Sequence, residues 1–479
     1  MELSSALKSE EELKSFWFVL DQGQLVPIEQ YKFKKEQQNL KKLADYEIAK
    51  NRKVTEKPPH IDLMKKLGIA DNEPASDSGN MRFYPKGRLL KALLEQYISK
   101  RVARYGGIEV ETPIMYDAKN PLTASYFNRF PARQYNIDSD QNKKLFLRFS
   151  ADFGQFLMAK DFQISYKSMP LKLYELTRYS FRREKHGELV GLRRLRAFTM
   201  PDCHAFCKDM VQAKEQFLER LELSMDVLEK IGISTKNDIE MALRFTEDFY
   251  YKNQEFIDKL ASKFNRPVIV EMWKERFFYF VLKWEFNFID NSDKAAALST
   301  DQIDIENGNR YKIEFMDDDG TKKNPIILHN SPSGAIERII YALLEKSHRN
   351  SIQGNVPQIP LWLCHTQIRL IPINENFVSF CEKLASEIMD QIRIDIDDRD
   401  ESVNKKIRSA EKEWIPFIIV IGEHEQKTNI YRIRDRAQRK EYETGLKEIV
   451  NQITNQTKDM IFLPLNLPIC LSRRPQIMA

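Results

Sequence analysis

An alternation of side-chain types over residues 192–207 constrains the fold of this chain more than any other feature. Successive side chains of a β-strand point to opposite faces. Read as a strand, this segment has one face made of Arg194, Arg196, Phe198, Met200, Asp202 and His204. The opposite face is made of Arg193, Leu195, Ala197, Thr199, Pro201 and Cys203. A face with two arginines, an aromatic ring, a carboxylate and an imidazole is not a packing face, so we expect this strand to line a binding site.

The strand-like segment that precedes it has the same character. Arg182 and Glu184 are two residues apart, so they would share a strand face, and they come just before a turn at residues 185–187. Arginine suits phosphates and carboxylates because its fixed fork gives paired hydrogen bonds. The alternative is that these arginines and acids pair with one another on a solvated sheet, which Phe198 fits poorly.

Length and composition indicate a globular protein of several domains. The chain has 479 residues, of which 42% are hydrophobic and 30% charged. Its longest apolar runs, such as 417–421, are far shorter than the roughly 20 residues of a membrane span. No signal-peptide pattern is present at the N-terminus, so we expect a cytoplasmic protein without a membrane partner. The net charge of +5 permits a nucleic-acid partner without arguing for one, and five cysteines without a CxxC pair suggest neither disulfides nor a zinc ribbon.

The sequence predicts three regions. Residues 1–60 are an N-terminal extension, helical over their second half and with no role that their pattern indicates. Residues 61–355 contain helical periodicity at 88–104 and 211–231 and strand-like segments between 171 and 329. A cluster of Asn, Ser, Gln, Gly and Pro at 347–360 marks a boundary. Residues 356–479 form an α/β domain, with strands expected at 366–371, 392–396 and 416–421 and helices at 376–390, 402–410 and 440–454.

Three segments resemble the motifs of class II aminoacyl-tRNA synthetases. Residues 106–113 resemble motif 1, residues 177–184 with 191–199 resemble motif 2, and residues 331–338 resemble motif 3. The flanking segments 130–133, 244–247, 299–304 and 464–475 are similar to archaeal-type threonyl-tRNA synthetases. The resemblance covers residue 58 to the end. It implies a mixed α/β (α+β) fold, with an antiparallel catalytic sheet flanked by helices and a C-terminal α/β anticodon-binding domain.

The resemblance implies a threonine–tRNA ligase. Such an enzyme activates threonine with ATP and Mg²⁺ and transfers it to the 3′ end of tRNA(Thr), and the class implies a homodimer. Arg182 would hold the α-phosphate and the amino-acid carboxylate, and Arg194 and Arg338 would hold the outer phosphates. Glu184 would face the adenine amino group, with Phe198 stacked on the ring. Arg182 and Arg338 would also stabilise the transition state.

The resemblance also implies how threonine is selected. Valine is isosteric with threonine, so only a site that must satisfy the hydroxyl rejects it strongly. The family uses a zinc ion held by one cysteine and two histidines, and His204 and His329 match the histidines. Asp202 matches the residue that accepts a hydrogen bond from the threonine hydroxyl. Tyr279 and Gln302 match further pocket residues.

The cysteine of the family pattern is absent, since Asp152 occupies its position. A carboxylate oxygen ligates zinc at about 2.0–2.2 Å, so a zinc site made of Asp152, His204 and His329 is chemically reasonable. A metal-free pocket or an altered specificity are the alternatives.

Two basic clusters in the last region suggest contacts to the anticodon. One spans residues 405–408, and the other places alternate arginines at 432–436, which would share a strand face. With the resemblance, they point to Arg399, Arg408 and Arg434 as tRNA-contacting residues. A solvated charged strand is the alternative.

Two further expectations concern fidelity and function. Serine lacks only one methyl group of threonine, worth about 1–3 kcal/mol, so selection should leak serine. Full-length relatives carry an N-terminal editing domain for which residues 1–60 are too few, so we expect a separate editing protein to remove serine. The alternative function is a non-catalytic tRNA-binding paralogue, which the ATP-binding residues argue against.

Overall fold

The computed structural model describes residues 15–49, 56–127, 134–139, 143–184, 187–276 and 278–475, in two compact units. The larger unit comprises residues 1–58, 74–80 and 98–342, and the smaller comprises 59–73, 81–97 and 343–479. Residues 1–14 and 50–55 of the expected extension, residues 130–133 and the turn at 185–186 lie outside the described residues. Within the described part, no helix is both long and apolar enough to cross a membrane.

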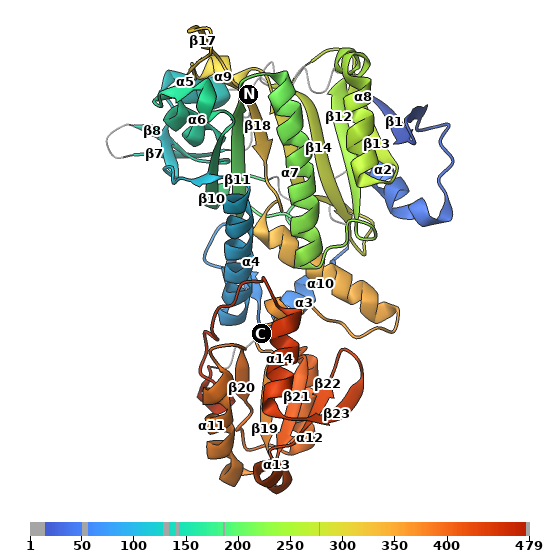
Figure 1. Ribbon diagram of the computed structural model, residues 1–479, viewed down its shortest axis with the longest axis vertical. Coiled ribbons are helices and arrows are strands. Elements are labelled where there is room, and N and C mark those ends of the chain that lie inside the picture. The colour runs from blue at the N-terminus through green and yellow to red at the C-terminus, as the bar shows by residue number, and fades with distance from the viewer. Residues whose placement is uncertain are drawn as a thin grey trace. The chain divides into compact units, whose positions relative to one another are not determined.

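A ten-stranded sheet forms the larger unit (Figure 1). Its strands run in the order β2 (Gln24–Pro27), β1 (Ser15–Asp21), β13 (Val268–Trp273), β12 (Ile239–Thr246), β14 (Phe280–Ile289), β15 (Ala295–Asp304), β18 (Ile326–Asn330), β11 (Ala197–Cys207), β10 (Leu171–Phe181) and β5 (Ile108–Glu109). Among the described strands of this sheet, only β12–β13 and β5–β10 are parallel pairs. The mixed α/β fold with a largely antiparallel sheet is confirmed.

Helices cover both faces of this sheet. α7 (Met210–Ile231) and α8 (Glu247–Phe264) lie side by side on one face (Figure 1), where Phe217 of α7 packs edge-on against Trp284 of β14. Neighbouring strand residues point to opposite faces, so Lys283 and Glu285 face the other side. There, α2 (Gln38–Ala49) packs on β12 to β15, and its Glu47 pairs with Arg244, the register partner of Lys283, at 2.9 Å. The polar face of the sheet is therefore the one under α2.

The described part of the N-terminal region belongs to this sheet. β1 pairs antiparallel with β13, and β2 pairs with β1. Val19 and Leu20 are buried, and Val19 packs with Leu40 and Leu43 of α2 in one apolar cluster. The helix expected in the second half of residues 1–60 is present as α2, whereas no strand was expected here.

Smaller elements surround the end of the sheet that carries β10 and β11. They are β6 (Met115–Asp117), β8 (Lys144–Leu147) and β7 (Tyr135–Asp138) in one sheet, β17 (Lys322–Lys323), β16 (Phe315–Met316) and β9 (Ile164–Ser165) in another, and helices α5 (Pro121–Phe127), α6 (Asp152–Lys160) and α9 (Asn307–Arg310). Phe153 and Phe156 of α6 pack with Phe206 of β11 and Ile327 of β18. This cluster holds the first turn of α6 against the sheet.

The expected strand over 192–207 begins later than predicted. β10 ends at Phe181 and β11 begins at Ala197, so Arg182, Glu184, Arg194 and Arg196 lie in the connection between these strands. The prediction of a strand for these arginines was wrong because the chain turns at Gly191, whose φ is +44°. The alternation holds from Phe198 to His204.

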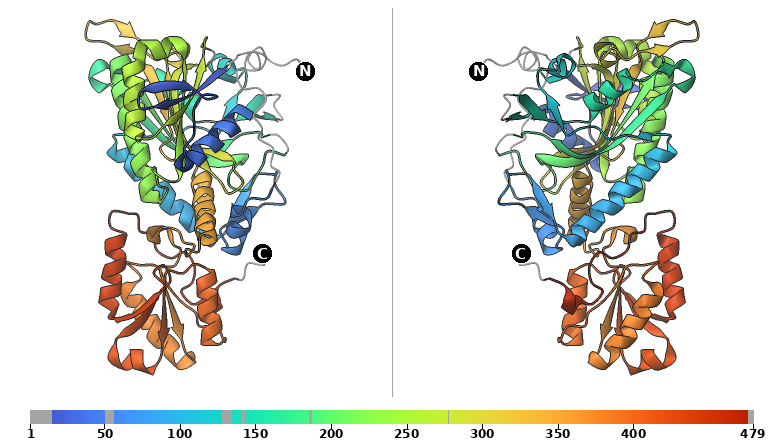
Figure 2. Two further views of the ribbon diagram at one scale, coloured as in Figure 1. Left: turned by 90° about the vertical axis from the view of Figure 1, so that its right-hand side faces the viewer. Right: turned by 90° about the vertical axis from the view of Figure 1, so that its left-hand side faces the viewer.

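The smaller unit contains a five-stranded sheet in the order β20 (Ile394–Ile396), β19 (Ile368–Pro372), β21 (Phe417–Ile421), β22 (Tyr431–Asp435) and β23 (Lys440–Thr444). Its helices are α11 (Val378–Ile388), α12 (Val403–Lys412), α13 (Glu423–Thr428) and α14 (Leu446–Gln456), and the unit also contains α3 (His60–Lys66), β3 (Ala70–Asn72) and β4 (Met81–Phe83). α11 and α14 share one apolar cluster and α12 another, so helices cover both sides of the sheet (Figure 2). Two further α-helices of the described residues are α4 (Pro85–Arg104) and α10 (Ile336–Ile352).

One predicted helix of this unit was partly wrong. Residues 440–444, expected as helix, form strand β23, and α14 begins only after its N-cap, Gly445. The pairing of β23 with β22 outweighs the helical pattern of these polar residues.

Candidate active site

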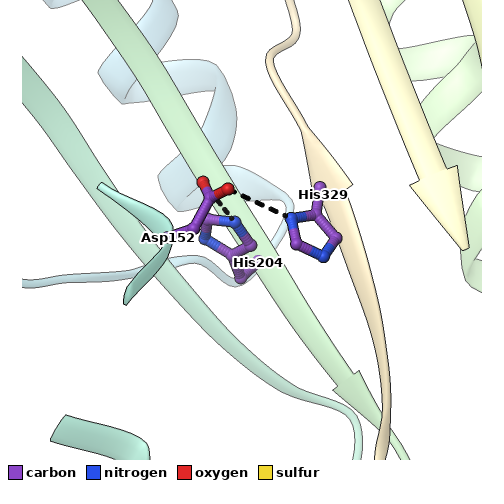
Figure 3. A group of neighbouring side chains, drawn as sticks. All are labelled: Asp152, His204 and His329. Carbon is purple, nitrogen blue, oxygen red and sulfur yellow. Dashed lines mark ion pairs between the residues drawn. The ribbon is translucent and has the colours of Figure 1, made fainter. Parts of the chain in front are cut away.

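Three side chains that are far apart in the sequence lie together on the polar face of the sheet (Figure 3). Asp152 is the first residue of α6, His204 lies on β11, and His329 is its register partner on β18. Nε2 of His204 is 3.2 Å from Oδ1 of Asp152, and Nδ1 of His329 is 3.7 Å from Oδ2. All three are buried.

A second hydrogen bond orients each ring. Nδ1 of His204 donates to Oε1 of Gln155 at 2.8 Å, and Nε2 of His329 donates to Oδ2 of Asp304 at 2.8 Å. The other nitrogen of each ring therefore faces Asp152. Phe156 packs edge-on against both imidazoles, at 5.3 and 5.6 Å between ring centroids, and closes the group on one side.

These residues fit a zinc ion. A tetrahedral ion with ligand bonds of about 2.1 Å separates its donor atoms by about 3.4 Å, and the measured separations of 3.2 and 3.7 Å lie on either side of that value. The buried Nδ1 of His329 has no hydrogen-bond partner in the part of the chain that the structure describes. A ligating histidine typically donates its other ring nitrogen to a carboxylate or amide oxygen, as both do here. Three ligands leave a fourth position for substrate.

Electrostatics couple the members of this group. Burial would raise the pKa of Asp152, but the two imidazoles, by close contact and by charge, hold it well below its usual range. Burial lowers the pKa of His204, whereas at His329 the opposing effects of Asp152 and Asp304 outweigh burial and raise the pKa to about 9. Burial and the nearby charge of Asp152 raise the pKa of Asp202.

The three side chains expected to contact threonine surround this group. Asp202 lies two residues before His204 on β11, on the same strand face, and accepts a hydrogen bond from Oγ1 of Thr177 at 2.9 Å. The hydroxyl of Tyr279 donates to Oε1 of Gln302 at 2.6 Å, and the Tyr279 ring lies 5.2 Å from that of His329.

A polar cavity of about 260 Å³ holds most of the expected ATP-binding residues. Arg182, Glu184, Arg194 and Arg338 line it, together with Tyr46 and Glu47 of α2, and Arg244, Lys283 and Glu285 of the sheet. Phe198 is not among the lining residues; it is buried on β11, opposite Ser180 of β10. A larger cavity, of about 520 Å³, lies between β1, β12 and α8 and contains none of the expected site residues.

Inside the polar cavity, two residues expected at opposite ends of ATP contact each other. Nε and Nη2 of Arg194 donate to Oε2 of Glu184 at 3.0 and 2.9 Å, and Arg194 also pairs with Glu188 at 2.9 Å. Arg338 donates to the carbonyls of Arg193 and Ala297. Arginines and acids therefore do pair with one another, as the alternative interpretation held, but they do so inside a cavity. Arg194 must leave Glu184 before it can contact a phosphate.

In the smaller unit, the three arginines expected to contact tRNA lie on or against α12. Arg399 pairs with Asp397 at 2.7 Å and lies 3.4 Å from Ser409, Arg408 is exposed on α12, and Arg434 of β22 lies 3.7 Å from Glu411. Arg436, expected on the strand face of Arg434, lies beyond β22.

Two residues of the site were missed from the sequence. Gln155 follows Asp152 by one helical turn, and Asp304 follows Gln302 by two residues on one strand face. These spacings were available as signals, because each residue lies on the same face of its helix or strand as a residue already assigned to the site. The contribution of α2 to the cavity had no such signal.

The sheet, the arginine-lined cavity and the group of Asp152, His204 and His329 on the same face define a class II aminoacyl-tRNA synthetase. Residues 135–347 match the family model described as the tRNA synthetase class II core domain (G, H, P, S and T), and residues 367–456 match that of the anticodon binding domain. The class uses ATP with Mg²⁺.

Similar proteins narrow the class. The chain is 60% identical over 477 residues to the threonine–tRNA ligase of Nitrosopumilus maritimus. The match covers 99% of this chain and 76% of that protein. It is 56% identical to that of Cenarchaeum symbiosum and 52% identical to that of Pyrococcus horikoshii; each match covers 99% of this chain, and respectively 77% and 76% of the relative. The chain belongs to the threonine–tRNA ligase family.

A solved structure supports the fold alone. It is the crystal structure of the RNA binding domain of threonyl-tRNA synthetase from Cryptosporidium parvum, with a TM-score of 0.72 and 21% identity. The similarity covers 83% of this chain and 98% of that one.

Proposed function

We propose that this chain activates threonine with ATP and transfers it to tRNA(Thr), with Asp152, His204 and His329 as the group that reads the amino acid. The observation that carries this proposal is the convergence of the three side chains next to Asp202, on the face that also holds the arginine-lined cavity. The product serves protein synthesis, so a cytoplasmic location is part of the proposal, as is the homodimer that motif 1 implies.

Threonine is recognised by its hydroxyl. A zinc ion held by Asp152, His204 and His329 would supply a Lewis acid for the amino group and the hydroxyl of threonine. Asp202 accepts a hydrogen bond from that hydroxyl. Valine offers no such donor and would leave the half-buried carboxylate of Asp202 without this hydrogen bond, which is a strong ground for rejection. Tyr279 and Gln302, joined at 2.6 Å, line the same pocket.

ATP occupies the polar cavity, accompanied by Mg²⁺. Arg194 exchanges Glu184 for the outer phosphates, which frees Glu184 to accept from the adenine amino group. A carboxylate oxygen of threonine attacks the α-phosphorus, and the bond to pyrophosphate breaks. Arg182 holds the α-phosphate and Arg338 the leaving group, so fixed positive charge is already present where negative charge develops.

Transfer to tRNA uses the smaller unit for recognition. Arg399, Arg408 and Arg434 contact the anticodon region, and a ribose hydroxyl at the 3′ end of tRNA attacks the carbonyl of threonyl-adenylate, releasing AMP. The match of residues 367–456 to the anticodon binding domain supports this assignment.

Serine enters the same pocket. It keeps the hydroxyl and loses one methyl group, which discriminates only about 10- to 200-fold. We expect measurable Ser-tRNA formation, and a free-standing editing protein that hydrolyses it completes the proposal. Efficient hydrolysis of Ser-tRNA by the purified chain alone would contradict that last part.

Amino-acid-dependent ATP–pyrophosphate exchange tests the function. We expect exchange with threonine, weak exchange with serine and none with valine. No exchange with any of the three, in a protein that still binds tRNA, would identify the non-catalytic paralogue instead. Asp152 in the cysteine position is the observation that favours that second candidate.

A further inference from the structure

We propose that Arg220, on α7, is a positioning residue for the threonine pocket. It holds three strands of the sheet from the face opposite the pocket and thereby fixes the spacing of the side chains that bind the amino acid. This inference rests on the function proposed above.

Arg220 is completely buried, which is rare for an arginine. Its Nη2 donates to the carbonyl oxygen of Cys203 at 2.6 Å, and its Nη1 donates to that of Leu328 at 3.4 Å. Its Nε lies 2.9 Å from Oδ2 of Asp301. The two groups form an ion pair, but the N–H does not point at the oxygen, so this contact is not a hydrogen bond. One guanidinium group thus contacts β11, β18 and β15.

Two of these contacts fall on the backbone beside the histidines. Cys203 lies between Asp202 and His204 on β11, and Leu328 comes directly before His329 on β18. A shift of either carbonyl moves the neighbouring imidazole with it, because the side chain and the carbonyl are only one residue apart.

The third contact reaches the strand of Gln302. Oδ1 of Asp301 accepts a hydrogen bond from the backbone N–H of Gln302 at 2.8 Å. Asp301 is the register partner of Trp284, which packs against α7. Gln302 is the register partner of Lys283, which lines the polar cavity on the opposite face of the sheet. Arg220 and Asp301 therefore act from behind the sheet.

Strand pairing fixes only part of this spacing, because β11 and β18 pair without a break through His204–His329 whereas β15 and β18 do not. β15 and β18 pair at Ile303–Leu328 and Asp304–Ile327, and they pair again only at Thr300–Ser331. The interrupted stretch contains Gln302 and His329. Arg220 lies behind this gap, and one helical turn further on α7, Ser224 accepts a hydrogen bond from Asn330, which also donates to the carbonyl of Thr300 at 2.9 Å.

The chemistry of the contact requires arginine. Two carbonyls and a carboxylate are reached at once by a planar fork with several N–H groups. Lysine retains the charge but presents a single ammonium group on a flexible stem. Arg220→Lys therefore tests the geometry while leaving one positive charge next to Asp301.

The experiment compares Arg220→Lys with the matched control Arg266→Lys. Arg266 lies in the same unit and also binds a carboxylate, Glu240, and two carbonyls, those of Thr235 and Ile239, but it lines the cavity without expected site residues. The readouts are Tm, zinc affinity by chelator competition, and the KM values for threonine and ATP in pyrophosphate exchange.

For Arg220→Lys we expect the KM for threonine to rise about tenfold or more, the zinc affinity to fall about tenfold, and the KM for ATP to stay within about twofold. Arg266→Lys should lower Tm without moving either KM. If Arg220→Lys changes both KM values equally, or lowers only Tm as the control does, the inference is overturned.

The double variant Arg220→Met/Asp301→Asn covers the case in which the single variant folds poorly. It removes both charges, so its Tm should recover while its KM for threonine and its zinc affinity stay impaired; recovery of all three would show a merely structural ion pair. Absence of exchange in the unmodified chain would instead be a failure of the proposed function. In that case, equal zinc affinity in Arg220→Lys and Arg266→Lys would still overturn the positioning role.

Discussion

The carboxylate of Asp304 lies 2.8 Å from Nε2 of His329, on the strand adjacent to that of the histidine. This contact turns the opposite ring nitrogen towards Asp152. A carboxylate behind a ligating histidine both fixes the ring and raises the basicity of the ligating nitrogen. We therefore expect the affinity for zinc to depend on Asp304, which does not itself contact the proposed metal.

Replacing Asp304 should weaken zinc binding without abolishing it. Loss of the hydrogen-bond partner of a ligating histidine typically costs about 10- to 100-fold in metal affinity, so we expect that loss for Asp304→Ala and a smaller one for Asp304→Asn. Chelator competition measures it. Asp293→Asn, an exposed carboxylate that pairs with Lys42, is the control and should bind zinc normally. Equal affinities for Asp304→Ala and the control would contradict this role.

Phe198→Leu should raise the KM for ATP and leave the KM for threonine nearly unchanged. Stacking of a base on an aromatic ring is worth about 1–3 kcal/mol, which corresponds to roughly 5- to 150-fold. Phe264→Leu, a buried aromatic of α8 that stacks on Phe286, controls for lost packing. An unchanged KM for ATP in Phe198→Leu would show that the ring is only a core residue, in keeping with its burial on β11.

Arg408→Ala and Arg434→Ala should impair aminoacylation and not activation. Both residues lie in the smaller unit, so we expect the KM for tRNA to rise severalfold while threonine-dependent pyrophosphate exchange stays constant. Lys427→Ala removes an exposed lysine of α13 that pairs with Glu423 and serves as the control. An equal effect of all three variants would indicate bulk charge rather than a defined RNA contact.

The stability of the larger unit should carry a pH dependence from Glu240. Burial raises the pKa of Glu240 from 4.5 to about 7, and Arg266 offsets this only in part. The folded state therefore holds this proton to higher pH than the unfolded state does. Its contribution to the free energy of unfolding is complete below about pH 4.5 and is lost as the pH rises through about 7.

Glu240→Gln removes this dependence. Relative to the variant, the unmodified chain should lose stability between pH 5 and pH 8, by an amount on the order of 3 kcal/mol at most. Thermal or denaturant unfolding of both proteins across this range measures the difference. A difference that does not vary with pH would contradict the raised pKa.

The sequence predicted the residues of the site better than it predicted the elements that hold them in place. The strand period from Phe198 to His204 could be recognised because large or ionisable side chains alternate there with small ones. Asp152 could be placed only through resemblance, since a turn of α6 carries no pattern that points to a distant strand. Residues 15–27 read as an extension because β1 and β2 are short edge strands, and their pairing with β13 is a long-range contact.

Other features depended on tertiary context. Arg194 and Arg196 fit the strand period, but Gly191 permits a turn that ends it. Residues 440–444 fit the helical pattern of the residues that follow them, but in the structure they form a strand because they pair with β22. Arg220 lies in a helix whose periodicity was predicted correctly, yet no local pattern indicates that a buried arginine contacts three strands.

Asp152→Ala tests most directly whether Asp152, in the position of the family cysteine, holds a zinc ion that binds threonine. Zinc content and threonine-dependent pyrophosphate exchange are measured side by side on the variant and on the unmodified chain. We predict one zinc ion per unmodified chain, exchange that a chelator abolishes and added zinc restores, and loss of both properties in the variant. An unmodified chain that exchanges with threonine in the presence of the chelator, or a variant that retains zinc and activity, would contradict the account.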